Sequence, residues 1–424
     1  MKILILGGRV ESVQTANASI RINIATKLKA MGHQVTFIAI NQNSNTTEQT
    51  EFETHSVRST LHWRLLTKKK DKGLSGFEKL LWCLVKIVRN IHNAFFLPLY
   101  PDIDPFQSIE VYRLARKLYN AGKFDAIIAV FRPYSSLSAL IKIKNKIPNV
   151  ICGAYYLDVC TELQKPKIMP SWLFNVLWHR SEKRVFEKSD FILLPRNVQH
   201  YFESDQYAIY KEKFEFCEFP AFVEPHLNDS GSNNRPENEV KIVFAGTLSH
   251  TFRNPEYILR ILGEVSKKIP NISLSVYGRG DCVKILEKYK SVVDIHLHGA
   301  VEQKTVMDAY VHADFILNIS NTFSNMVPSK IFELFATGKP IINIVKTTED
   351  TSAKYFEKYP SVCNVNEWEE IGSQIEKVER FIVGEKGKYY DPAIFANKFY
   401  EHTPQYIAKV VERRINISRN TYEV

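Results

Sequence analysis

The sequence lacks paired cysteines and long apolar runs. Its six cysteines form no C-x-x-C pair and no cluster with histidines at metal-ligand spacing; they are Cys83, Cys152, Cys160, Cys217, Cys282 and Cys363. This scatter disfavours structural zinc and favours a reducing, cytoplasmic setting. No apolar run has the roughly twenty residues that a membrane-spanning helix needs. The first apolar run stops at Gly7-Gly8, too early for a signal segment, so we expect a soluble or peripheral protein.

The glycine pattern of dinucleotide-binding dehydrogenases is also missing. Gly7-Gly8 follows the first apolar run, but no third glycine completes G-x-G-x-x-G, which disfavours that enzyme class. The net charge of +10 suits nucleic acid, an anionic membrane or a phosphorylated small molecule. Because no recognisable nucleic-acid module accompanies the charge, we expect no nucleic-acid partner.

What is present is a repeated alternation of strand and helix patterns. The chain has 424 residues, about twice the usual domain size. Strand-like runs end in glycine turns and are followed by helical spacing, which predicts parallel α/β units. We therefore predict a first α/β domain over 1–224, a linker over 225–239 that is rich in Asn, Ser and Pro, and a second α/β domain over 240–395. A helical tail covers 396–424.

One segment of the first domain departs from this alternation. Within an insertion over 55–105, residues 61–100 are basic, aromatic and apolar together, and Lys68-Lys69-Lys70 precedes the run LLWCLVKIVRNIHNAFF. Such content is typical of a helix lying on an anionic membrane surface. A helix packed on its own sheet, with its lysines in solvent, is the alternative.

Glycine turns in the second half mark a candidate anion-binding edge. Gly246-Thr247 and Gly278-Arg279-Gly280 each follow a strand-like run, where backbone N–H groups can hold phosphate. Any α/β protein uses small residues at single turns, but successive strand ends meet along one edge. We therefore expect one crevice there.

The stretch SNMVPSKIFELFATGKPIINI, residues 324–344, adds charged groups to that crevice. Pro328 suits the first turn of a helix, so Ser329 and Lys330 would lie where phosphate is attracted. Glu333 lies on nearly the same helix face as Lys330 and can accept hydrogen bonds from sugar hydroxyls. A plain surface ion pair between these two residues is the alternative.

The stretch NMVPSKIFELFATGKPII, with VFAGTL, VYGRGD and HLHGAV, resembles the nucleotide-binding half of GT-B-fold glycosyltransferases and is most similar to glycosyltransferase family 4. The resemblance implies two Rossmann-like domains facing a cleft, the tail helix crossing back to the first domain, and retaining transfer from a sugar nucleotide without metal. It implies that Glu333, which matches the second glutamate of the family's Glu-x7-Glu motif, binds the ribose. Asn325 stands in place of the first glutamate, which in the family faces the donor sugar. The resemblance places Ser329 and Lys330 at the diphosphate.

Further site residues follow from the same resemblance. Arg253, with Gly246, would neutralise the leaving diphosphate, and Arg279 is a second candidate. His298 lies at the turn where the base packs. Gly8 and Thr247 complete the expected donor-binding set.

The acceptor side is less marked. Asp158 follows the run GAYYL, where it could deprotonate an acceptor hydroxyl or cap a helix. The triplet Asp102-Ile-Asp104 lies between two prolines, which favours a turn over a metal site. Glu182 and Arg184 fit the solvated face of a helix.

These observations predict a glycosyltransferase. The donor would be a nucleotide diphosphate sugar, and the acceptor a glycan or lipid-linked saccharide of surface-polysaccharide assembly at the inner face of the membrane. We expect no cofactor and no metal. A sugar-nucleotide epimerase or phosphorylase of the same fold, or a non-catalytic binding protein, remains as the alternative.

Overall fold

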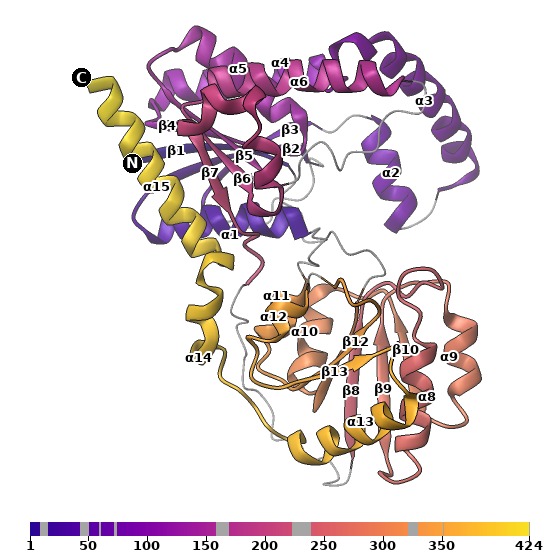
Figure 1. Cartoon of the computed structure of the whole chain (residues 1–424). Helices are drawn as coiled ribbons and strands as arrows, with labels where there is room; N and C mark the ends of the chain where they lie inside the picture. The colour runs from indigo at the N-terminus through magenta and orange to yellow at the C-terminus, as the bar shows by residue number, and fades with distance from the viewer. Residues whose placement is uncertain are drawn as a thin grey trace. The chain divides into compact units, whose positions relative to one another are not determined.

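The chain forms two compact units, and each is described separately (Figure 1). The first unit combines Met1–Pro220 with Thr403–Val424, and the second is Ala221–His402. The computed structural model describes residues 1–8, 16–42, 51–58, 61–71, 74–157, 169–222, 239–320, 330–350 and 352–423. The predicted linker, 225–239, lies outside these ranges except for Glu239.

The first unit is built on a seven-stranded parallel sheet in the order β3-β2-β1-β4-β5-β6-β7. Its strands are β1 (Lys2–Gly7), β2 (Gln34–Gln42), β3 (Glu53–Arg58), β4 (Ala126–Phe131), β5 (Ile151–Tyr156), β6 (Phe191–Pro195) and β7 (Phe214–Cys217). Five of them are apolar runs of the kind from which the sequence predicted α/β units. The other two, β3 and β7, are edge strands of mixed polarity, so no continuous apolar run marks them.

Helices cover both faces of this sheet. The helices of this unit in the described ranges are α1 (Ala16–Ala30), α2 (Leu61–Asp71), α3 (Gly76–Phe95), η1 (Leu97–Leu99), α4 (Pro105–Gly122), α5 (Tyr134–Lys146), α6 (Ser171–Lys188), η3 (Arg196–Val198), α7 (Gln199–Phe202), η4 (Asp205–Lys213) and α15 (Pro404–Glu423). Among the helices in the described ranges, none is long and apolar enough to cross a membrane.

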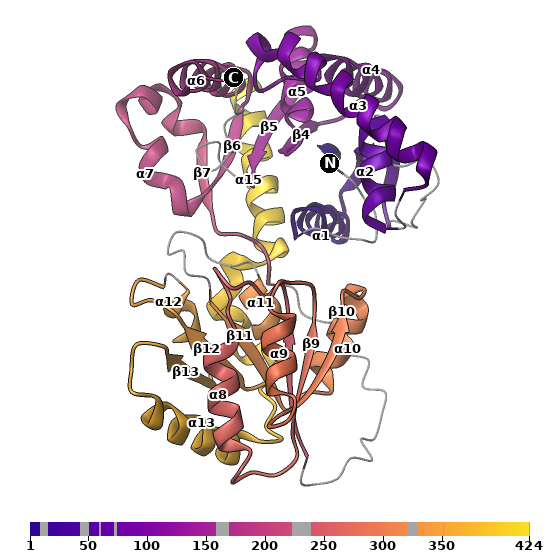
Figure 2. The same ribbon diagram turned by 90° about the vertical axis from the view of Figure 1, so that its right-hand side faces the viewer.

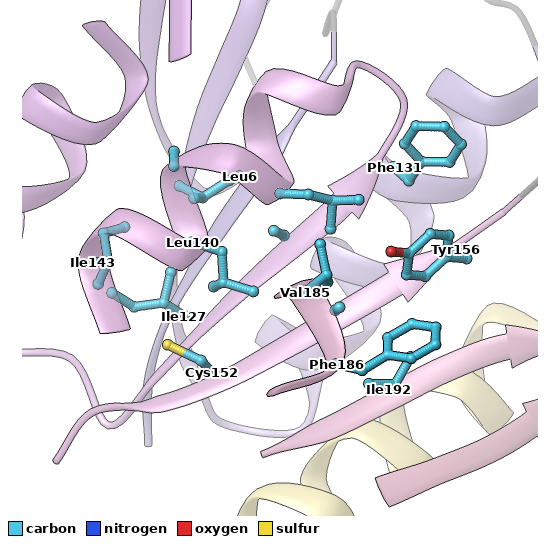
Figure 3. Close-up of a cluster of buried hydrophobic side chains, with 14 of the residues drawn as sticks. Leu6, Ile127, Phe131, Leu140, Ile143, Cys152, Tyr156, Val185, Phe186 and Ile192 are labelled. Atoms are coloured by element: carbon cyan, nitrogen blue, oxygen red, sulfur yellow. The ribbon is translucent and has the colours of Figure 1, made fainter. Parts of the chain in front are cut away.

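Alternate residues of each strand supply two cores. Leu4 and Leu6 face the core formed with α4, α5 and α6, shown in Figure 3, where Leu140 and Val185 pack over the strands. Ile3 and Ile5 point to the opposite face, where α1 and α15 pack. The C-terminal helix α15 thus belongs to the first unit although the chain reaches it only after the second.

The second unit contains a six-stranded parallel sheet in the order β10-β9-β8-β11-β12-β13 (Figure 2). The strands are β8 (Val240–Ala245), β9 (Ile272–Tyr277), β10 (Asp294–Gly299), β11 (Phe315–Ile319), β12 (Ile341–Val345) and β13 (Val362–Asn366). The helices are α8 (Glu256–Val265), α9 (Val283–Tyr289), α10 (Gln303–Val311), α11 (Lys330–Phe335), α12 (Ala353–Phe356), α13 (Ile371–Glu385), α14 (Pro392–Ala396) and η5 (Asn397–His402).

The second unit extends past residue 395, where the sequence placed its end. Phe395 and Phe399 are buried in one core cluster with Phe332 and Phe335 of α11. These aromatic contacts hold α14 and η5 to the second unit. The chain returns to the first unit only at Thr403.

Candidate functional site

Three loops meet at the carboxyl edge of the second sheet, where β8, β9 and β10 end. The N–H of Gly246 donates to the Tyr277 carbonyl at 2.7 Å, and the N–H of Gly278 donates to the Gly299 carbonyl at 2.7 Å. The N–H of Leu248 donates to the Arg279 carbonyl at 3.1 Å. The predicted glycine turns are therefore neighbours, bonded backbone to backbone.

This close approach explains two of the glycines. A Cβ atom on Gly278 would lie 1.9 Å from the Gly246 carbonyl oxygen, and the residue has a φ of +138°. A Cβ atom on Gly280 would lie 2.1 Å from the Leu248 carbonyl oxygen. Because no side chain fits at either position, the loops can adopt this arrangement only with glycine there.

Two cationic side chains converge on Gly246. A Cβ atom there would lie 3.6 Å from Arg253 Nη1 and 3.6 Å from Lys330 Nζ. Arg253 is brought back to the strand end by a tight turn, in which Ser249 and Arg253 exchange backbone hydrogen bonds at 3.2 and 3.0 Å. Lys330 is the first described residue of α11 and donates from Nζ to the Ala245 carbonyl. Residues 85 positions apart in the chain thus meet at one strand end.

Burial sets the electrostatics of this pair. Arg253 is half-buried, and its Nε is enclosed with no hydrogen-bond partner in the described part of the chain. Burial lowers the pKa of Arg253. Burial, with a smaller effect of nearby Arg253, lowers the pKa of Lys330 to about 8, and Glu333 opposes this shift. Two poorly solvated cations at one place are stabilised by an anion.

Glu333 lies one turn after Lys330 on α11. Burial raises the pKa of the Glu333 carboxyl, and the Lys330 charge opposes that rise. Tyr310 of α10 lies near Glu333. Burial is the main cause of the raised pKa of the Tyr310 hydroxyl, and the negative charge of Glu333 raises that pKa further. That hydroxyl is buried without a hydrogen-bond partner among the described residues. No local pattern in the sequence distinguishes Tyr310, which is one aromatic residue in an ordinary amphipathic helix.

The remaining predicted residues of this unit line the same edge. His298 stacks on Tyr277 with ring centroids 4.2 Å apart and planes 5° apart, and burial lowers the pKa of His298. Thr247 and Arg279 are exposed.

A pocket at this edge is lined by Gly246, Leu248, Gly278, Arg279, Gly280 and Gly299, among others. A larger pocket, on the first unit, adjoins Lys2, Gln34 and Glu53 at the amino ends of its strands. Ligands of parallel α/β sheets bind at the carboxyl ends of the strands. We therefore do not assign the donor to the pocket beside Lys2.

Four predicted residues are not part of this described group. Three of them, Asp158, Asn325 and Ser329, are outside the described residues. The fourth, Gly8, directly follows β1 in the first unit, and a Cβ atom on it would lie 2.6 Å from Nη2 of Arg21. The absence of a side chain at Gly8 thus has a local cause, the buried guanidinium of Arg21 on α1.

The structure also resolves the acidic residues considered on the first unit. Asp104 caps α4 by accepting from the Gln107 N–H at 3.2 Å, and Asp102 accepts from Ser108 and Ser138 at 2.6 Å each. The predicted turn is present, because the Asp102 N–H donates to the Leu99 carbonyl at 2.9 Å, whereas the capping role of Asp104 was not predicted. The prediction for Glu182 is wrong: it is 1% exposed and accepts from the Tyr207 hydroxyl, because η4 folds over that face of α6.

One trio in the second unit has metal-ligand chemistry. Ligand-type atoms of His250, Asp281 and Cys282 lie within 4.8 Å of one another. Asp281 accepts from the His250 N–H at 2.9 Å and from Cys282 Sγ at 3.4 Å, which accounts for the grouping. Burial, with Asp281 adding to it, raises the pKa of the Cys282 thiol to about 12.

Comparison with known proteins identifies the class. Residues 239–351, which include the glycine loops, Arg253, Lys330 and Glu333, match the family model described as "Glycosyl transferases group 1". The chain is a glycosyltransferase of the GT-B fold. No curated protein matches the sequence.

Several solved glycosyltransferase structures share the fold of this chain, although their sequence identity to it is low. WaaG, a glycosyltransferase involved in lipopolysaccharide biosynthesis, aligns with a TM-score of 0.52 and 13% identity over 97% of this chain and 99% of its own. The lipopolysaccharide outer core galactosyltransferase WaaB aligns with a TM-score of 0.52 and 11% identity, over 98% of this chain and 99% of its own. The catalytic domain of starch synthase IV from Arabidopsis thaliana, bound to ADP and acarbose, aligns with a TM-score of 0.53 and 10% identity, over 99% of each chain.

Proposed function

We propose that this glycosyltransferase transfers a sugar from a nucleoside diphosphate sugar to a hydroxyl acceptor. The observation that carries the proposal is the convergence of Arg253 and Lys330 on Gly246 at the carboxyl edge of the second sheet. Cleavage of the donor's glycosidic bond leaves an oxocarbenium-like carbon and a diphosphate with added negative charge. Fixed cations in a poorly solvated place stabilise that charge most where it develops.

Each remaining group has a proposed part in holding the donor. Glu333 accepts hydrogen bonds from the ribose, and Tyr310 supplies a nearby buried hydroxyl. The stacked Tyr277 and His298 rings offer an aromatic surface for the base. The exposed Arg279 lies where a second phosphate contact is available. We propose further that Ser329 and Asn325 contact the diphosphate and the donor sugar, and that Asp158 orients the acceptor hydroxyl.

Several finer points belong to the same proposal. The reaction is retaining, as in family 4, and proceeds without metal because Arg253 and Lys330 supply the cationic charge. The acceptor is a lipid-linked saccharide of surface-polysaccharide assembly, presented at the cytoplasmic face of a membrane that the segment 61–100 contacts. WaaG and WaaB, named for lipopolysaccharide, support this acceptor class.

Binding of sugar nucleotides tests the donor site. A panel varying in base and sugar is added to the full chain, and the melting temperature is recorded. We expect at least one compound to stabilise the chain, by about 2.7 kcal/mol at a hundred times its dissociation constant. Glu333→Ala should reduce that shift, because the ribose loses its acceptor. If no compound shifts the melting temperature and Glu333→Ala changes nothing, the donor site is refuted.

A further inference from the structure

Helix α3 turns an apolar face to the outside of the first unit. Its 20 residues include none that is buried. Phe77 and Phe95 are each 76% exposed, and Ile91 is 65% exposed. The apolar face of α3 is defined by seven exposed residues at intervals of one, three or four: Phe77, Leu80, Leu84, Ile87, Val88, Ile91 and Phe95. Helical residues so spaced form a single stripe.

The opposite side of α3 contacts the protein. Trp82 stacks on His62 of α2 with ring centroids 5.0 Å apart, and Arg89 Nη1 lies 2.9 Å from His62 Nε2. Glu78 pairs with Lys68 of α2. In Figure 1, α3 forms the outer edge of this unit with α2 on one side. A helix that serves only to cover a core packs its apolar stripe inward, whereas α3 has the reverse orientation.

The exposed apolar surface continues past the end of α3. Phe106 at the start of α4 is 62% exposed and contacts Phe96, with ring centroids 5.8 Å apart. Phe96 also contacts Phe95 of α3, with ring centroids 5.0 Å apart, so these rings link the end of α3 to the start of α4. An exposed apolar surface that is continuous over two helices marks an interaction site.

Charge indicates what the face meets. Residues 61–100 contain eight lysines and arginines but only two acidic residues, so the segment carries more than half of the chain's net +10. Lys79 and Lys86 are exposed on the polar side of α3, and Lys68 and Lys69 are exposed on α2. An apolar stripe with lysines on the other face is the pattern of a helix that lies in a lipid headgroup layer. Two copies of this chain would instead bring two cationic segments together, which opposes self-association.

We propose that the apolar face of α3 enters the headgroup layer of a membrane containing anionic lipid, while the lysines of α2 and α3 attract that lipid. At 1.5 Å per residue the helix offers a stripe of about 30 Å lying along the surface. This inference specifies the membrane contact of the proposed function. The purpose of that contact rests on the proposed function. Docking there holds the enzyme where a lipid-linked acceptor is available.

Vesicle binding by the full chain tests the inference. Vesicles of phosphatidylcholine, with or without phosphatidylglycerol, are sedimented with wild type and with the double variant Ile87→Glu, Ile91→Glu. We expect the double variant to lose about tenfold or more in partitioning to anionic vesicles. The matched control, Val383→Glu with Ile394→Glu, changes two residues that are 71% and 76% exposed on the second unit, and should bind as wild type.

The electrostatic part has its own variant. Lys79→Gln with Lys86→Gln should weaken binding to anionic vesicles by about fivefold per charge and leave binding to neutral vesicles unchanged. All substituted residues are exposed, so circular dichroism and melting temperature should match wild type in each variant.

Three outcomes would overturn the inference. They are no vesicle binding by wild type, equal losses in the control variant, and a concentration-dependent dimer that the Ile87 and Ile91 substitutions dissociate while vesicles stay unbound. The assay contains neither donor nor acceptor, and donor binding is measured without lipid. Failure of docking and failure of the donor site are therefore separate results.

Discussion

Lys330 is the residue whose chemistry depends most on its surroundings. Its ammonium group donates to a backbone carbonyl, and burial lowers its pKa to about 8. The charge that we assign to the diphosphate site is therefore full below that pH and is lost as the pH rises through it. Sequence analysis identified Lys330 and Arg253, but the spacing of residues could not reveal that both reach Gly246.

This shift predicts pH-dependent binding of a nucleoside diphosphate. Wild-type affinity should be steady near neutral pH and should fall above about pH 8, by at most tenfold per pH unit, because deprotonation of Lys330 removes one cation. Isothermal titration calorimetry with the nucleoside diphosphate of the best donor measures this affinity at each pH. Lys330→Met should bind more weakly, without that fall. An identical fall in Lys330→Met would assign the titration to another group.

Residues outside the motifs show the limit of sequence reasoning. Glu182 was expected in solvent because its own helix has a polar side, but the covering element, η4, begins more than twenty positions later. Tyr310 is buried beside Glu333 only because α10 and α11 pack on one face of the second sheet. Such partnerships depend on tertiary packing that local patterns do not encode.

At the scale of elements, the glycine loops hold the candidate site together. The carbonyls of Gly246 and Leu248 occupy the space that side chains on Gly278 and Gly280 would need. The sequence predicted these loops at successive strand ends because apolar runs followed by glycine are a strong local signal. It could not predict β3 or β7, which are edge strands of mixed polarity.

Gly278→Ala should destabilise the second unit. The added Cβ atom would meet the Gly246 carbonyl oxygen at 1.9 Å, so we expect a loss of about 2–4 kcal/mol and a melting temperature lower by several degrees. Gly384→Ala is the matched control, since a Cβ atom there meets nothing within 4 Å; it lies in α13 and should be neutral or slightly stabilising. Equal melting temperatures for Gly278→Ala and wild type in calorimetry would refute the close packing of these loops.

At the scale of the whole molecule, the chain passes twice between its units. It leaves the first unit at Pro220 and returns at Thr403, so that α15 completes the core against α1. The alternation of strand and helix patterns was enough to predict two parallel α/β units, because most of the buried strands are largely apolar runs. The end of the second unit depended on aromatic contacts of Phe395 and Phe399, which composition alone does not show.

The central claim is that this glycosyltransferase uses Arg253 to stabilise a departing nucleoside diphosphate. The most direct measurement is the rate at which nucleoside diphosphate is released from the best sugar nucleotide while sugar appears on an acceptor saccharide, detected by mass spectrometry. We predict that Arg253→Ala lowers kcat by about a hundredfold or more, whereas Arg260→Ala, an exposed arginine of α8, stays within about twofold of wild type. Wild-type turnover that Arg253→Ala leaves unchanged, or no turnover with any donor of a full panel, would contradict the claim.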